Sequence, residues 1–344
     1  MATGLTALGD IGYNTGIHVS ANMIKNGLPY VCFEPFGQAE KMPKNKGATI
    51  RWIGWDPLDP TPTPLAEGVT PLAQKMSKRS VSADLVQLGS VVEITDVIED
   101  THEDPVLKIA CRELGVQYVE MVERFRFGEL KAGTNVHRAG DVASRDLITE
   151  KVSVDLMRRV RRTMRRNRAK PVTEIVDSTP NFNTVNIHRC YPVLAHPDLE
   201  TDIEALPGFK HVEDYGQASP WPNEIGAWSI FRFLLTDILE PWADAGGAVD
   251  GSQMSTTGTN CDVYPMFICA ENAYGIVSLA GHLAKNSNGK MEPVLPAIPF
   301  VHNPSKSTKS DMLGQKGGAG FKTWAAAKIL QDLWFVRAEV AVSK

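Results

Sequence analysis

Three stretches of the sequence carry residue types that could do chemistry, and two of them are rich in glycine. The run GQKGGAGFKT, residues 314–323, resembles a phosphate-binding loop, but that motif needs Gly directly before its Lys, and Phe321 precedes Lys322 here. GIVSLAG would make Ser278 a hydrolase nucleophile only if the flanking glycines stood one residue closer to it. The sequence therefore predicts a flexible connector at 314–323 and no serine nucleophile.

The third stretch is a possible metal site. His188 and Cys190 alternate on a predicted strand and would point to one face, but two ligands do not make a zinc site and no HExxH occurs. The acidic THED at 101–104 is explained by capping of a helix start, where carboxylates favour the exposed N–H groups. The sequence therefore predicts a structural His–Cys pair, with no catalytic residue, no metal and no cofactor.

Arginine dominates the strongest charge feature. A helix is predicted from the Ser153 cap to a point before Pro171, with Leu156, Met157, Val160 and Met164 as its buried stripe. The other face carries, before Lys170, the arginines Arg158, Arg159, Arg161, Arg162, Arg165, Arg166 and Arg168. This face is either solvated, or binds nucleic-acid phosphates, or meets the acidic surface of a neighbouring subunit. The acidic candidates for such a contact between subunits are Glu93, Asp96, Glu99, Asp100 and Glu103.

Composition places the chain among ordinary globular proteins. It has 344 residues, 43% of them hydrophobic, and 36 Lys+Arg against 40 Asp+Glu give a net charge of −4. These values exclude a disordered chain, a collagen-like repeat, a coiled-coil rod and a uniformly basic coat for nucleic acid. The five cysteines are scattered without a CxxC pair, which favours buried free thiols in a reducing compartment. Without a signal peptide or a run of ~18 apolar residues, we expect a soluble protein made in a cytoplasm and not bound to a membrane.

A long two-stranded excursion is predicted near the N-terminus. ATIRWIGW (48–55) reads as one strand, a segment with five prolines follows (57–71), and the chain returns through a Val-, Ile- and Ser-rich strand (80–98). A lone two-stranded ribbon is marginally stable in water. We therefore expect a neighbouring subunit to support it, and hence obligate assembly.

The clearest helix is predicted at 104–132. Asp104 suits the N-cap, Pro105 the first turn and Gly133 the stop, and a rod of about 42 Å results at 1.5 Å per residue. Its apolar stripe comprises Leu107, Ala110, Cys111, Leu114, Tyr118, Met121, Val122 and Phe125. Beyond it we expect short mixed strands and helices, a run at 226–242 that is either strand or buried helix, and loops at 243–260 and 301–322. A final alternating strand is predicted at 333–342.

Seven segments in order between Phe36 and Glu339 resemble one family. They are FGQAEKMPKNKGATIRW, TPLAEGVTP, GSVVEITDVIEDTHEDPVL, RNRAKPVTEI, HPDLETDI, EIGAW and DMLGQKGGAGFKTWAAAKILQDLWFVRAE. The chain resembles the major capsid proteins of tailed phages with the Hong Kong-97-like fold, and within them the N-four-like podovirus branch.

The resemblance implies an α+β fold in five parts. They are an N-terminal arm (1–45), an extended E-loop hairpin (46–90), a P-domain with the spine helix and the arginine-rich helix (91–170), a mixed α/β A-domain (171–315) and a return to the P-domain with the C-terminal strand (316–344). Some members of the fold crosslink Lys to Asn between subunits, and no local signature for that is present.

The implied function is structural, and the chain is not expected to be an enzyme. The subunit would assemble as hexamers and pentamers into the icosahedral head around double-stranded DNA. Its partners would be copies of itself, scaffolding protein, portal, a possible decoration protein and, non-specifically, genomic DNA. It would reside in the virion, after assembly in the cytoplasm of the host bacterium and procapsid maturation. The E-loop tip that would lap onto the next subunit is Pro64, Leu65, Glu67, Gly68, Thr70 and Pro71.

Two alternatives stay open at this point. One is the shell protein of an encapsulin-type bacterial nanocompartment, which shares the fold. The other is a soluble hydrolase that uses Ser278 or a metal held by His188 and Cys190.

Overall fold

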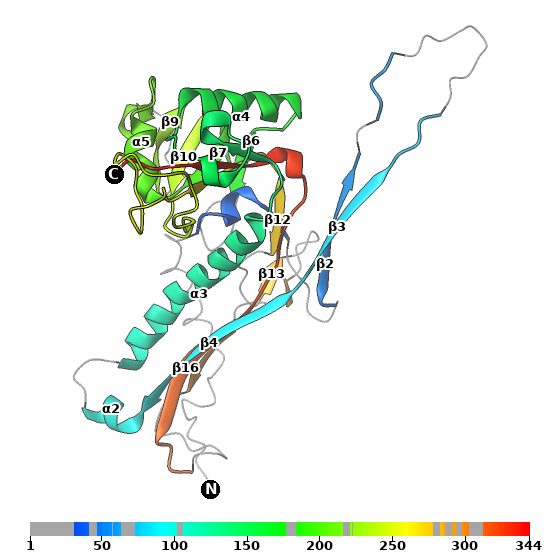
Figure 1. Cartoon of the computed structure of the whole chain (residues 1–344). Coiled ribbons are helices and arrows are strands. Elements are labelled where there is room, and N and C mark those ends of the chain that lie inside the picture. The colour runs from blue at the N-terminus through cyan, green and yellow to red at the C-terminus, as the bar shows by residue number, and fades with distance from the viewer. Residues whose placement is uncertain are drawn as a thin grey trace.

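A large sheet, a long helix with its own smaller sheet, and a projecting ribbon make up the chain (Figure 1). The computed structural model describes residues 31–40, 47–56, 58–62, 73–101, 106–176, 184–215, 221, 223–277, 283–285, 291–293, 298–302 and 312–344. The predicted E-loop tip at 64–71, Asp104, Pro105 and Ser278 lie outside these residues.

The large sheet has eight strands in the order β5-β18-β11-β7-β10-β9-β8, with β6 paired to β7. They are β5 (Val136–Arg138), β6 (Val172–Val176), β7 (Thr184–Ala195), β8 (Lys210–His211), β9 (Glu224–Trp228), β10 (Phe231–Leu235), β11 (Tyr264–Cys269) and β18 (Phe335–Val340). Every residue of β11 is buried, because strands covered on both faces carry continuous rather than alternating apolar residues. The same is nearly true of β18, which is a strand as predicted but shows little alternation in burial.

Helix α4 (Val154–Arg166) covers one face of this sheet. The Ser153 side chain accepts a hydrogen bond from the Leu156 backbone N–H at 3.3 Å, which confirms the predicted cap. All four residues of the predicted stripe are fully buried among the apolar side chains of the sheet. The sequence grouped α4 and the last strand with the long helix, but both belong to the layer of the large sheet.

The opposite face of the large sheet is covered by the end of α3 (Val106–Leu130) and by the segment 31–40. Phe127 and Leu130 of α3 pack there beside Phe33. The helix ends at Leu130, three residues before Gly133, where the sequence predicts the stop. Further up the helix, every residue of the predicted stripe is buried or half-buried.

The remainder of α3 lies against a three-stranded sheet of order β15-β16-β4. This sheet contains β4 (Val86–Thr95), β15 (Ile298–His302) and β16 (Lys316–Ala325), and α2 (Asp96–Thr101) follows β4. The Tyr118 ring of α3 meets Phe321 of β16 edge-on, with ring centroids 5.3 Å apart.

The prediction of a connector at 314–323 is wrong, and so is much of the predicted loop at 301–322, since β15 and β16 occupy its two ends. Gly318 and Gly320 lie within the ten-residue strand β16, paired along its length with β4. A Cβ at Gly318 would stand 2.7 Å from the Val92 carbonyl oxygen, and one at Gly320 would stand 2.8 Å from that of Ser90. The glycines therefore permit a close approach of two backbones.

The predicted ribbon is present as an antiparallel pair of β2 (Thr49–Trp55) and β3 (Lys78–Asp84), but the rest of the predicted return strand at 80–98 is β4, which pairs with β16 instead. Its base is anchored in the same chain, because Trp52 is buried in a small apolar cluster with Ile50 and Val277. A Cβ added to Gly275 would lie 2.5 Å from the Trp52 ring, so glycine makes room for this anchor. The ribbon then extends away from the rest of the molecule (Figure 1).

Smaller elements complete the described chain. A three-stranded sheet joins β1 (Gln38–Glu40), β12 (Tyr274–Val277) and β17 (Ala327–Ile329), and β13 (Leu283–Lys285) pairs with β14 (Met291–Pro293). The short helices are η3 (Glu34–Phe36), η4 (Ala139–Asp141), η5 (Arg145–Leu147), η6 (Pro197–Leu199), α5 (Glu200–Glu204), η7 (Val212–Tyr215) and η8 (Asp332–Trp334). The undecided run at 226–242 contains the end of β9 and all of β10, which form an antiparallel pair.

A buried ion cluster ties the N-terminal described segment to α3. Arg126 is 1% exposed, and its two terminal nitrogens each lie 3.2 Å from Glu34 Oε2. It also pairs with Glu123 and donates to the Val277 carbonyl at 2.8 Å. The other Glu123 oxygen accepts the Phe33 backbone N–H at 2.8 Å. Burial alone would lower the pKa of Arg126, but the two carboxylates raise it above its ordinary value, so the guanidinium stays charged.

Candidate interaction surfaces

The predicted arginine face of α4 exists, and its members have different partners. Arg159 points inward, forming an ion pair with Asp141 and donating to the Arg138 carbonyl at 3.0 Å. Arg158 lies 3.6 Å from Asp155 one turn away, an exposed pair of little energetic value. Arg159 is therefore structural, and the others define the surface.

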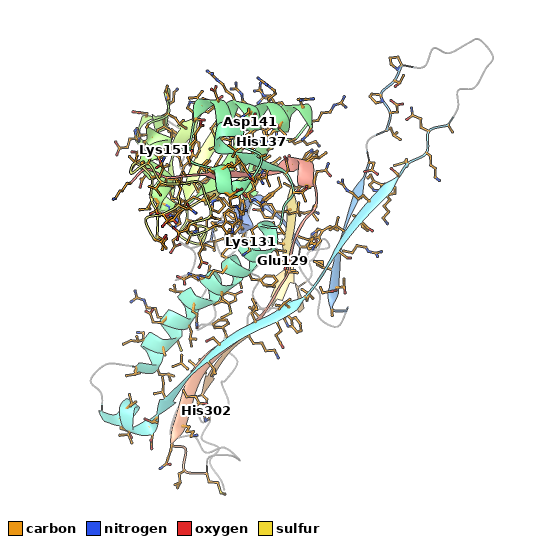
Figure 2. The ribbon with its side chains drawn as sticks, viewed as in Figure 1. Glu129, Lys131, His137, Asp141, Lys151 and His302 are labelled. Atoms are coloured by element: carbon orange, nitrogen blue, oxygen red, sulfur yellow. The ribbon has the colours of Figure 1, made fainter. Side chains whose placement is uncertain are left out.

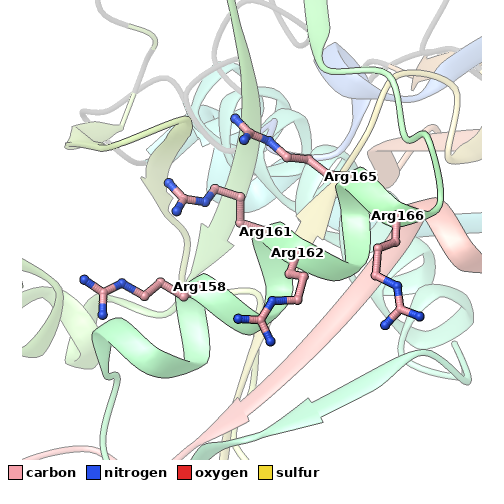
Figure 3. A pocket seen from close by; sticks show the side chains of 5 residues that line it. All are labelled: Arg158, Arg161, Arg162, Arg165 and Arg166. Carbon is pink, nitrogen blue, oxygen red and sulfur yellow. The ribbon is translucent and has the colours of Figure 1, made fainter.

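Five guanidinium groups line one open pocket, here called the arginine pocket: Arg158, Arg161, Arg162, Arg165 and Arg166. Figure 3 shows Arg161 and Arg165 reaching to one side of α4 and Arg162 and Arg166 to the other. Arg161 donates to the Ser229 hydroxyl at 2.8 Å. The side chains of Arg162, Arg165 and Arg166 form no hydrogen bond or ion pair with any residue that the structure describes.

The end of the helix adds a strained position. Arg168 has a left-handed backbone (φ 51°), the conformation that glycine adopts most easily at this place after a helix. The Ala169 N–H closes the helix end by donating to the Met164 carbonyl at 2.9 Å. Arg168 and Lys170 are exposed just beyond the arginine pocket and extend its positive charge.

The predicted acidic residues lie far from the arginines of the same chain. Glu93 is on β4 and Asp96 and Asp100 are in α2, at the far end of α3 from α4 (Figure 1). Glu103 and the Glu99 side chain lie outside the described residues. Within one chain, the two charged sets are therefore not brought together.

The outer ribbon presents apolar side chains to solvent. Trp55 is 61% exposed, and Ile53, Leu58 and Met76 around it are also exposed. The sequence prediction named the tip and missed these four residues. The alternation in TIRWIGW is the signal that could have found the first two, since Ile53 and Trp55 alternate with the buried Ile50 and Trp52 and therefore lie on the opposite, exposed side of the strand.

The chemical candidates do not form a site in the described structure. Figure 2 shows the labelled groups spread along the molecule, with His302 on the small sheet, Glu129 and Lys131 at the end of α3, and Asp141 near α4. Among the described residues, no three His, Cys, Asp or Glu side chains gather to hold a metal ion. The described helices include none that is long and apolar enough to cross a membrane.

Cys190 is buried, which disfavours the thiolate form that acts as a nucleophile or a metal ligand. Burial raises the pKa of its thiol to about 12, against a smaller lowering by Arg232. All five cysteines are free, four of them buried, which confirms the prediction of scattered thiols. The side chain of His188 and all of Ser278 lie outside the described residues.

Comparison with known proteins identifies the family. A family model described as phage capsid protein matches residues 78–273, more than half of the chain. The chain belongs to the phage capsid protein family. A major capsid protein of Pseudomonas phage KPP21 is 26% identical over 229 residues, which cover 62% of this chain and 55% of that protein. The chain thus matches little more than half the length of that relative.

Solved structures agree on the fold. The capsid of Ralstonia phage GP4 matches with a TM-score of 0.67 at 12% identity, covering 90% of this chain and 87% of that one. The cyanophage Pam1 capsid matches with a TM-score of 0.59 at 12% identity, covering 93% of both chains. The head of Helicobacter pylori bacteriophage KHP40 matches with a TM-score of 0.59 at 10% identity, over 87% of this chain and 85% of that one. The chain therefore has the mixed α/β Hong Kong-97-like fold. Its membership of the phage capsid protein family makes it a structural protein and not an enzyme.

Proposed function

We propose that the chain is the major capsid protein of a tailed phage, which assembles as hexamers and pentamers into the icosahedral head around double-stranded DNA. One observation carries the proposal: the ribbon of β2 and β3 projects from the body with large apolar side chains in solvent. A surface of this kind marks an interaction site when it is contiguous. A second copy of the chain is the natural partner, since the family forms shells.

The ribbon argues for assembly on physical grounds. Two paired strands without a third strand or a packing surface are marginal in water. The base has such a surface in Trp52 and its cluster, whereas Trp55 is largely exposed. Covering Trp55 against a neighbour would remove most of its apolar surface from water, which contributes roughly 1.5–3 kcal/mol per large side chain. The tip that follows, 64–71, would then lap onto the adjacent subunit.

The division into parts follows the packing. We assign α3, β4, β15 and β16 to the P-domain, because they pack on one another. The eight-stranded sheet and α4 form the A-domain, which would cluster at the centre of each capsomer. This division moves α4, β5 and β18 from the P-domain, where the sequence placed them, to the A-domain, and β15 from the A-domain to the P-domain. Residues 1–45 keep their role as arm, and residues 46–85, up to the start of β4, keep that of the E-loop.

The finer expectations rest on the resemblance in sequence. They are membership of the N-four-like podovirus branch, a precursor shell built on scaffolding protein in the host cytoplasm, incorporation of a portal, a possible decoration protein, and expansion when DNA is packaged. The order of the matching segments from Phe36 to Glu339 supports them.

The test removes the ribbon contact while sparing the body. We expect deletion of residues 56–72 to abolish shells in negative-stain images and to leave folded monomers or capsomers. Trp55→Asp should do the same, whereas the matched variant Trp55→Phe should still assemble, because it keeps the apolar contact. Normal particles from the deletion would refute the proposal. Small DNA-free shells from the wild-type chain without scaffold would favour a nanocompartment instead.

A further inference from the structure

The arginine pocket has a concentration of positive charge that the fold of the monomer does not need. Helix α4 carries six arginines and one acidic residue, Asp155, over 13 residues. Its packing depends on the apolar stripe on the other side of the helix. Three pocket arginines have no described hydrogen-bonding or ionic partner, and none of the five lining residues is acidic. Like charges held this close repel one another, so an anion brought from outside would stabilise the arrangement.

The shape of the pocket favours a repeating anion. Arg161 and Arg165 form one row and Arg162 and Arg166 a second, on two sides of the helix (Figure 3). Within each row the arginines are four residues apart, or about 6 Å along the axis. This is close to the rise of two nucleotides on one strand of DNA, about 7 Å. Arginine also binds phosphate through two parallel N–H donors, which lysine cannot do.

We propose that the arginine pocket binds the phosphate backbone of duplex DNA, independently of base sequence. The inference rests on the proposed function, in which this chain encloses a packaged duplex, and it names the surface that meets that duplex. Only arginine lines the pocket, so it lacks the amide side chains that recognise adenine and the aromatic rings that stack on unpaired bases.

The alternative to DNA as the ligand of the arginine pocket is the acidic surface of a second copy of the chain. The residues of that surface argue against this alternative. The described acidic groups at the end of β4 and in α2 lie among exposed apolar residues of the same elements, with Val91 70% exposed and Val97 62% exposed. Helix α4 has no large exposed hydrophobic residue to match them. A protein contact would therefore place apolar side chains against guanidinium groups, whereas a DNA backbone offers charge alone.

The experiment compares two pairs of substitutions in the full chain before assembly. Arg162→Gln with Arg166→Gln removes two charges four residues apart on α4. The control, Lys108→Gln with Arg112→Gln, removes two exposed charges at the same spacing on α3. Binding of a short fluorescent duplex is followed by anisotropy across a salt series, with two unrelated sequences and with polyglutamate as a competitor of equal charge. Negative-stain imaging scores shell formation separately.

We expect wild-type affinity to fall linearly on a log–log salt plot, by about 0.9 per phosphate contacted. The α4 pair should flatten the slope by about 1.8 and weaken binding tenfold or more at low salt, while the control pair should change neither. Both duplexes should bind equally, polyglutamate should compete poorly, and both variants should form shells. Equal weakening in the control pair, or equal competition by polyglutamate, would overturn the inference.

Loss of shells with unchanged DNA binding in the α4 pair would also overturn it, because the pocket would then be an interface between copies. A wild-type chain that binds DNA through the pocket but never forms shells would refute the proposed function alone. The two failures are therefore distinguishable.

Discussion

Replacing Arg126 with Met should destabilise the protein far more than an average substitution. The change removes one buried charge and leaves two, since the Glu123 side chain is 0% exposed and that of Glu34 is 5% exposed. Methionine fills much of the volume of the arginine stem, so the cavity left behind is small. The dominant cost is that the fully buried Glu123 carboxylate loses its ion pair and Glu34 loses its contacts with the same guanidinium, and breaking a buried pair in this way costs about 3–5 kcal/mol. The hydrogen bond to the Val277 carbonyl is lost as well.

A triple variant separates charge from packing. Adding Glu34→Gln and Glu123→Gln to Arg126→Met removes every charge of the cluster. The glutamine at 123 keeps a carbonyl oxygen to accept the Phe33 backbone N–H. We expect the triple variant to recover about 2 kcal/mol or more relative to the single variant, because the buried carboxylate charges that Arg126 neutralised are gone.

Urea unfolding of the full chain, followed by tryptophan fluorescence below the concentration at which shells form, measures these free energies of unfolding. A loss under about 1 kcal/mol for Arg126→Met, within the range of ordinary point variants, would refute the reasoning. So would a triple variant no more stable than the single one.

Three further predictions test other parts of the chain. Arg168→Gly should raise the free energy of unfolding by about 0.5–1 kcal/mol, since glycine adopts the left-handed backbone without strain; an unchanged urea midpoint would contradict this. Gly275→Ala should lower it by about 1–3 kcal/mol, because the new Cβ would stand 2.5 Å from the Trp52 ring; the added variant Trp52→Leu should relieve the clash. Burial would raise the pKa of Glu339, but Arg145 and the neighbouring arginines lower this pKa overall. The ionised carboxylate therefore stabilises the fold at pH values above the ordinary carboxyl pKa, near 4.5, and this stabilisation is lost as the pH falls further. Thermal unfolding between pH 5 and pH 3 should therefore depend less steeply on pH in Glu339→Gln than in the wild type.

Local patterns predicted the elements well where one side of an element is buried. The stripe of α4 and its Ser153 cap are confirmed residue by residue, the stripe of α3 is buried or half-buried throughout, and the predicted ribbon is present as β2 and β3. In each case the signal is local: apolar residues three or four positions apart for the helices, and residues with high strand propensity for the strands. No contact with a distant segment is needed to recognise it.

The glycine-rich run at 314–323 shows where this reading fails. Glycine has low strand propensity, and GQKGGAGFKT alone is typical of a connector. Its role as β16 depends on the backbone of β4, more than 200 residues earlier, which approaches too closely for any side chain at Gly318 or Gly320. No local pattern encodes a neighbour of that kind.

The sequence by itself determined which faces are apolar, which are charged and that a ribbon must project, because these properties depend on residue type and short spacing. Only the tertiary structure decided that Arg159 turns inward while the arginine pocket stays open, and that Glu34 completes the ion cluster of Arg126. It also decided that the acidic set lies at the other end of α3 from α4. The partner and the exposure of each of these side chains depend on segments that are far apart in the chain. These segments come together only when the sheets form.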